Sequence, residues 1–174
     1  MDETRIEKEM YEFAKDKLKY TFNDISWLAK AMRSKKIEIK GEGKNHSEYT
    51  NESLATVGDA LLKFIISDNL YRNNKGNLTK ESITKNRESI EKNSTMHKLM
   101  IEEAWIKYSY NDSSFTKDNP PNNEKVVCKN HDPYIEAIVG AIYYDSNFEC
   151  VKKWVENTLI PLLKSYAENK INLK

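Results

Sequence analysis

Several residue types are scarce in this sequence, and each scarcity excludes a class of protein. Five glycines and four prolines in 174 residues are too few for a turn-rich β-sandwich or a disordered tail. Two cysteines, Cys128 and Cys150, have neither metal-ligand nor redox spacing, so we expect reduced thiols and a cytoplasmic location. The longest apolar run, IEAIVGAIYY, is too short to span a bilayer, and the charged start MDETRIEKEM is unlike a signal peptide.

An excess of charge of one sign is also missing. The 28 basic and 27 acidic residues leave a net charge of +1, which counts against a strongly basic nucleic-acid binder. Local excesses of lysine and arginine do occur, over residues 30–44 and again over 80–92. Each excess is either a contact surface for phosphates or an ordinary solvated face, and composition does not choose between them.

The spacing of the apolar residues predicts one all-α domain that spans residues 1–174. We expect helices over 3–19, 25–32, 51–72, 79–93, 94–104, 132–145 and 148–159, the last continuing beyond Pro161 to residue 166. The polar stretch 33–50, which contains Gly41 and Gly43, is expected to be a flexible loop. Residues 105–130 are expected to be irregular.

The predicted helix over 51–72 carries acidic residues within an apolar pattern. Its expected apolar face consists of Leu54, Val57, Leu61, Ile65 and Leu70. Asp59 interrupts this pattern directly after Gly58, and Glu52 lies seven residues earlier on nearly the same side. A buried charge costs several kcal/mol unless something pairs with it. The partner is either an ion pair with a neighbouring helix, the commoner case for a single aspartate, or a metal ion.

A second acid stands in a similar position in the predicted helix over 132–145. Glu136 is flanked by apolar residues and followed by small ones, so two helices each offer an inward acid toward a shared cation. Mg²⁺ prefers oxygen ligands and needs few from the protein. Glu52 and Asp59 are about 10 Å apart along their helix axis, so Glu136 must complete the site with Asp59. Glu52 would act through water or at a second ion.

Four segments together resemble the ribonuclease III family. The family signature N-E-x-L-E-F-L-G-D-A-x-L is similar to NESLATVGDALL, and its second motif D-x-x-E-A-x-x-G-A-x-Y-x-D is similar to HDPYIEAIVGAIYYD. The usual opening of the nuclease domain resembles LKYTFNDISWLAKAM, and an L-T-x-x-R…N-x-x-L helix pair resembles ITKNRESIEKNSTMHKLM. The likeness covers roughly residues 5–165, with the motifs in the family's order.

The resemblance implies an all-helical ribonuclease III-type endonuclease domain that forms a homodimer. It implies Mg²⁺-dependent hydrolysis of double-stranded or structured RNA, with Mn²⁺ as a substitute, leaving 5′-phosphate and 3′-hydroxyl ends. Glu52, Asp59 and Glu136 match family acids and are the predicted catalytic residues, with Asp59 and Glu136 bound directly to the metal. Because no double-stranded-RNA-binding domain follows in the sequence, we expect the nuclease domain, its dimer or a partner to hold the RNA.

The sequence departs from the family pattern at two acids. Ala55 replaces the middle acid of the signature, and Pro133 replaces the Asp three residues before Glu136. Asp132, one residue earlier, is either a substitute metal ligand or a helix cap. Short family members that lack an RNA-binding domain also lack both acids. Thr56 replaces the aromatic residue that the family uses at its dimer contact.

These observations leave three readings open. The first is the Mg²⁺-dependent ribonuclease, which the retained acids favour. The second is a catalytically impaired relative that binds structured RNA or a ribonucleoprotein partner, which the two missing acids favour. The third is an unrelated helical bundle whose acids form structural ion pairs, and the two ordered motifs oppose it.

Overall fold

The computed structural model describes residues 1–34, 36–40, 45–119 and 133–168, and these residues form a mainly helical domain. Its elements are α1 (Glu3–Phe13), the π-helical turn η1 (Ala14–Leu18), α2 (Ser26–Met32), β1 (Lys36–Lys40), β2 (Asn45–Tyr49), α3 (Glu52–Asn73), α4 (Lys80–Ile90), α5 (Asn93–Glu102), the 3₁₀ turn η2 (Trp105–Tyr108), α6 (Tyr134–Asp145), α7 (Phe148–Trp154), the π-helical turn η3 (Val155–Leu159) and α8 (Ile160–Glu168). The predicted helical fold is confirmed. No described helix is both long enough and apolar enough to cross a membrane.

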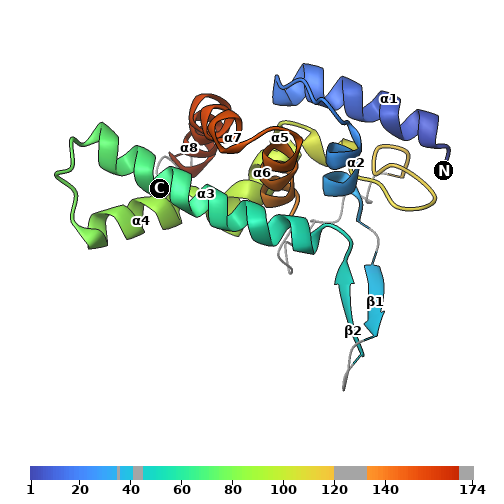
Figure 1. The fold of residues 1–174 in the computed structure, drawn as a ribbon, viewed down its shortest axis with the longest axis horizontal. Coiled ribbons are helices and arrows are strands. Elements are labelled where there is room, and N and C mark those ends of the chain that lie inside the picture. Colours follow the sequence, from blue (N-terminus) through green and yellow to red (C-terminus); the bar gives the residue numbers. More distant parts are fainter. Residues whose placement is uncertain (35, 41–44, 120–132, 169–174) are drawn as a thin grey trace.

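The expected loop over residues 33–50 is wrong in part, because it contains a β-hairpin. β1 pairs antiparallel with β2, with Lys36 opposite Tyr49 and Lys40 opposite Asn45. The hairpin extends away from the helices and leads directly into α3 (Figure 1). Its first strand, KIEIK, alternates polar and β-branched residues with the period of two that suits a strand.

The centre of the fold is a close crossing of α3 with α6. A Cβ atom added to Gly58 on α3 would overlap the backbone carbonyl of Glu136 on α6. A Cβ atom added to Gly140 would lie 2.5 Å from the carbonyl oxygen of Leu54. Backbone therefore meets backbone at this crossing, and only glycine fits at either position.

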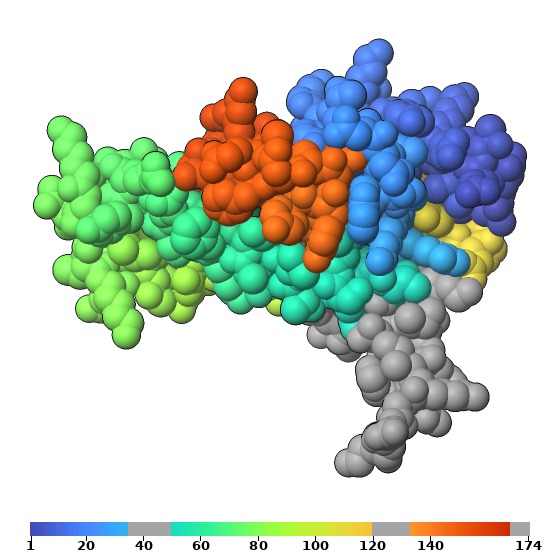
Figure 2. Space-filling view, viewed as in Figure 1, coloured from blue at the N-terminus to red at the C-terminus, as the bar shows by residue number. Residues whose placement is uncertain are grey.

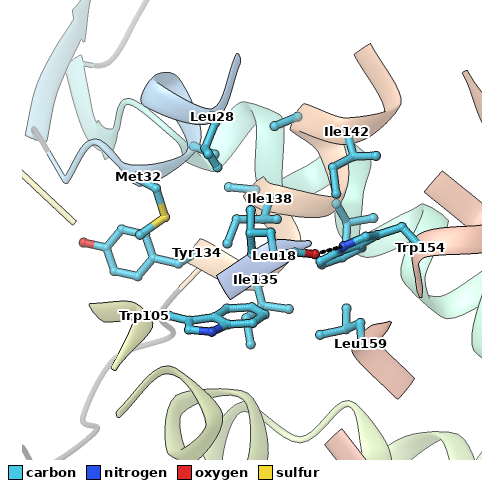
Figure 3. Close-up of a cluster of buried hydrophobic side chains, with 14 of the residues drawn as sticks. Leu18, Leu28, Met32, Trp105, Tyr134, Ile135, Ile138, Ile142, Trp154 and Leu159 are labelled. Atoms are coloured by element: carbon cyan, nitrogen blue, oxygen red, sulfur yellow. Dashed lines mark hydrogen bonds between the residues drawn. The ribbon is translucent and has the colours of Figure 1, made fainter. Parts of the chain in front are cut away.

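Helix α6 lies inside the hydrophobic core. Every residue from Tyr134 to Ile142 is buried, which accounts for the nearly unbroken apolar sequence of this helix. Figure 3 shows isoleucines of α6 gathered with Trp105 and Trp154 in one cluster. The indole N–H of Trp154 is buried and donates to the carbonyl oxygen of Leu18 at 2.7 Å, which ties α7 to the end of η1.

The C-terminal helical segment changes its winding near Pro161. Helical turns run from α7 through η3 to α8, and the π-helical turn η3 comes directly before this proline. Because Pro161 has no N–H to donate to the carbonyl four residues earlier, a π-bulge relieves the conflict. The expected helix through Pro161 is therefore present, with an irregular turn at the place where the proline acts.

Candidate functional site

Asp59 and Glu136 reach the same cavity from two different helices. The cavity has a volume of about 350 Å³ and is lined by Asp59, Lys63, Glu91, Asn93, Met96 and Glu136. The close crossing of α3 and α6 sets this arrangement, because Gly58 directly precedes Asp59 and touches the backbone of Glu136. Both acids that the sequence analysis assigned to one cation therefore line one cavity, and their binding of a cation stays a prediction.

The side chain of Asp59 is half exposed, so the expectation of a buried aspartate is wrong. Its exposed fraction is 43%, and its Oδ2 accepts from Nζ of Lys63 at 2.7 Å. Helix α3 buries Leu54, Ala55, Gly58, Leu62, Ile65 and Ile66, a face rotated from the expected one. Asp59 therefore lies at the edge of the buried face. An exposed ion pair between residues four apart contributes only about 0.3–0.5 kcal/mol, so this pair leaves the carboxylate available to a stronger partner.

Glu136 is buried, in contrast to Asp59. Its exposed fraction is 1%, and it lies in the first turn of α6. The positive end of the helix dipole favours a negative charge at this position. The backbone carbonyl of Glu136 packs against Gly58 on α3, and its side chain has almost no contact with solvent. The site thus combines one buried acid with one accessible acid.

Glu52 belongs to a neighbouring cavity that shares Asp59. This second cavity has a volume of about 300 Å³ and is lined by Glu52, Ala55, Thr56, Asp59 and Pro133. Ala55 and Pro133 are the positions at which the family pattern has acids, and both lie beside Asp59. Both missing family acids would therefore have lined this second cavity, beside Asp59. Asp132 lies outside the described residues, so its role as ligand or cap stays a prediction.

Glu91 and Lys63 are members of the site that the sequence analysis missed. Glu91 follows the last residue of α4, and burial raises the pKa of its carboxyl, while the charge of Arg87 opposes this rise. Nε of Arg87 lies 3.2 Å from Oε1 of Glu91. The spacing of four residues between Asp59 and Lys63 was a readable signal. No such signal exists for Glu91, because only the packing of α4 against α3 brings it to the cavity.

The donor set suits a hard cation better than zinc. Within the described ranges, no group of three His, Cys, Asp or Glu side chains is arranged to hold a metal ion. Mg²⁺ does not need such a cage, because it keeps several waters and takes one or two carboxylates from the protein. A cavity lined by Asp59 and Glu136, with room for several waters, fits that requirement.

Comparison with known proteins agrees with the sequence motifs. A family model described as Ribonuclease-III-like matches residues 41–163. Ribonuclease 3 of Phocaeicola vulgatus is 29% identical over 157 residues, which cover 87% of this chain and 46% of that protein. Ribonuclease 3 of Fusobacterium nucleatum is 30% identical over 133 residues, which cover 76% of this chain and 54% of that protein. The chain therefore spans about half of the length of these relatives.

Solved structures show the same fold. The nuclease domain of ribonuclease III from Campylobacter jejuni superposes with a TM-score of 0.62 and 21% identity, covering 89% of this chain and 96% of that domain. That structure is described as showing structural flexibility in the region involved in dimer formation. At this level of identity, the likeness establishes the arrangement of helices.

Proposed function

This chain belongs to the ribonuclease III family, and on that premise we propose that it is a Mg²⁺-dependent endoribonuclease of double-stranded RNA. The products would carry 5′-phosphate and 3′-hydroxyl ends. The observation that carries the proposal is the cavity that Asp59 on α3 shares with Glu136 on α6. Two carboxylates on facing helices, one accessible and one buried, would provide the oxygen ligands for the ion.

Each acid would have a distinct role. Asp59 and Glu136 would hold the ion, which supplies Lewis-acid activation of the attacking water and neutralises charge on the leaving 3′-oxygen. Glu136 provides the fixed position, because it is buried in the first turn of α6. Asp59 faces solvent, so an ion that it holds would be accessible to the RNA backbone. Glu52, in the adjoining cavity, would orient water rather than bind the same ion.

We also propose that two copies associate through α3. Large apolar side chains stand exposed on this helix: Phe64 is 56% exposed and Tyr71 is 49% exposed. Figure 2 shows α3 running along one face of the molecule, with α2 and the C-terminal helices beside it. Thr56 is exposed near the start of the same helix, where the family pattern has an aromatic residue. Sedimentation velocity of wild type and Phe64→Ser tests the proposal, and a monomeric wild type would overturn it.

A second candidate is an RNA-binding module without nuclease activity. It is favoured by Ala55 and Pro133, which leave the second cavity with fewer acids than the family pattern has. It is also favoured by the ion pair that engages Asp59 in the protein as it stands. This candidate predicts binding of duplex RNA with no cleavage at any Mg²⁺ concentration.

A cleavage assay separates the two candidates. The substrate is long duplex RNA, with single-stranded RNA of the same sequence for comparison, incubated with and without Mg²⁺. We expect wild type to cleave the duplex, and Asp59→Asn and Glu136→Gln each to lower the rate at least about 100-fold. Glu149→Gln, at an exposed acid on α7, is the matched control and should retain full activity. Full activity in both site variants would overturn the proposed site.

A further inference from the structure

Lys63 is the one basic side chain in the cavity that Asp59 and Glu136 line, as far as the described residues show. It lies one turn after Asp59 on α3, and its Nζ is 2.7 Å from Oδ2 of that residue. Its side chain is 46% exposed, so the ammonium group stands at the mouth of the cavity and not beneath it. The ammonium group of Lys63 would therefore lie close to the backbone of an RNA bound at Asp59 and Glu136.

Asp59 is the hydrogen-bonding partner of Lys63, and the charge of Glu91 in the same cavity also attracts it. Glu91 is engaged by a different cation, because Arg87 lies 3.2 Å from it on α4. Arg87 is also within 3.5 Å of the hydroxyl of Ser67 on α3, which fixes it beside Glu91.

The contact between Lys63 and Asp59 is of a kind that exchanges readily. Both side chains are nearly half exposed, and such pairs are weak because solvent screens them. A divalent cation offers Asp59 a stronger partner than an ammonium group. Once released, a lysine on its flexible four-carbon stem binds a phosphate oxygen well as a compact point charge.

We propose that Lys63 exchanges partners during the catalytic cycle, holding Asp59 in the metal-free protein and contacting an RNA phosphate when a divalent cation takes Asp59. The inference rests on the proposed nuclease function and names a substrate-contacting residue for it. Because Ala55 and Pro133 replace two family acids, the site offers fewer ligands for cations. Lys63 would then neutralise part of the phosphate charge. A lysine that only pairs with Asp59 would lower metal affinity without contributing to the binding of RNA.

The first test measures metal affinity without RNA. Mn²⁺ binding to full-length wild type, Lys63→Gln and Lys63→Arg is followed by electron paramagnetic resonance of free Mn²⁺. Because Gln no longer competes for Asp59, we expect Lys63→Gln to bind Mn²⁺ about twofold more tightly than wild type. Lys63→Arg should stay close to wild type. Lys153→Gln, at an exposed lysine on α7, is the matched control for loss of one surface charge.

The second test measures affinity for duplex RNA in Ca²⁺ as a function of salt, by fluorescence anisotropy. Loss of one phosphate contact should weaken binding by Lys63→Gln several-fold and reduce its salt slope by about one. Lys153→Gln should keep the wild-type slope. Circular dichroism at the same concentrations confirms that each variant is folded.

The two tests together decide the role of Lys63. Tighter Mn²⁺ binding with a reduced salt slope supports the exchange of partners. Behaviour of Lys63→Gln that matches Lys153→Gln in either test overturns it, even when wild type cleaves RNA. A wild type that does not cleave duplex RNA overturns the proposed nuclease function instead, and the two failures are therefore distinguishable.

Discussion

The carboxylate of Asp145, the last residue of α6, accepts a hydrogen bond from the backbone N–H of Asp24 at 2.7 Å. The same carboxylate accepts the backbone N–H of Asn23 at 3.0 Å and the hydroxyl of Tyr20 at 3.1 Å. Burial raises the pKa of Tyr20, and Asp145 adds to that rise. The side chain of Asp145 thus joins the C-terminal end of α6 to the turn that precedes α2. This gives the final Asp of the second sequence motif a structural role.

Replacing Asp145 with alanine should destabilise the fold by about 2 kcal/mol, because hydrogen bonds to a charged acceptor are among the stronger ones. Urea unfolding followed by circular dichroism measures the change. The matched control is Asp16→Ala, at an exposed aspartate in η1, which should change stability by less than about 0.5 kcal/mol. Equal stability of the two variants would contradict the anchoring role of Asp145.

Replacing Gly58 with alanine should destabilise the protein by at least about 2 kcal/mol, because the added methyl group meets the backbone of Glu136. The direction is diagnostic, since Gly→Ala in an unconstrained helix is stabilising. Thermal unfolding measures the change, with Ser53→Ala on the exposed side of α3 as the control. A stabilised Gly58→Ala would mean that α3 and α6 are not in close contact.

Replacing Ala55 with glutamate should make stability depend on Mg²⁺. Ala55 is buried beside Asp59, so a new carboxylate there has to lose its hydration near another negative charge. We expect a loss of about 2–4 kcal/mol without a divalent cation and partial recovery when Mg²⁺ is added. Ala55→Gln has nearly the same size without the charge, and its stability should not respond to Mg²⁺. An equal response of the two variants would argue against a cation at this position.

Replacing Tyr166 with phenylalanine should destabilise the fold by about 1 kcal/mol at pH 7, because its hydroxyl donates to Glu103 at 2.7 Å. Burial, followed by this hydrogen bond, raises the pKa of Tyr166 to about 12. The unfolded state releases this proton near pH 10 and the folded state retains it, so stability falls as pH rises through this interval. The difference between wild type and Tyr166→Phe in urea unfolding should therefore shrink between pH 10 and 12. A constant difference across that interval would contradict the shift.

Much of the helical framework could be predicted because each helix carries its own signals. At α4, for example, the hydroxyl of Thr79 accepts the N–H of Ser82, as expected for an N-cap residue. That Asp59 and Glu136 line one cavity could also be expected, from acids placed within apolar runs. The five-residue alternation in KIEIK is a weak strand signal among the polar residues and glycines that surround it, so the sequence does not predict the hairpin.

The exposure of Asp59 could not be predicted from the helix alone. The buried side of α3 is set by the contact of Gly58 with α6, a relation between two segments far apart in the sequence. Periodicity places the apolar residues on one broad side of the helix but does not fix its rotation to within one residue. Glu91 was missed for the same reason, because only the packing of α4 brings it to Asp59.

The crossing at Gly58 and Gly140 also bears on how this protein tolerates sequence change. Where the main chains of α3 and α6 touch, no side chain separates them. Exchanging one apolar residue for another elsewhere in the core therefore has little effect on the distance between the two acids. We therefore expect substitutions elsewhere in the interior to leave the spacing of Asp59 and Glu136 nearly unchanged. Two residues that carry no functional group thus set how the two proposed metal ligands are aligned.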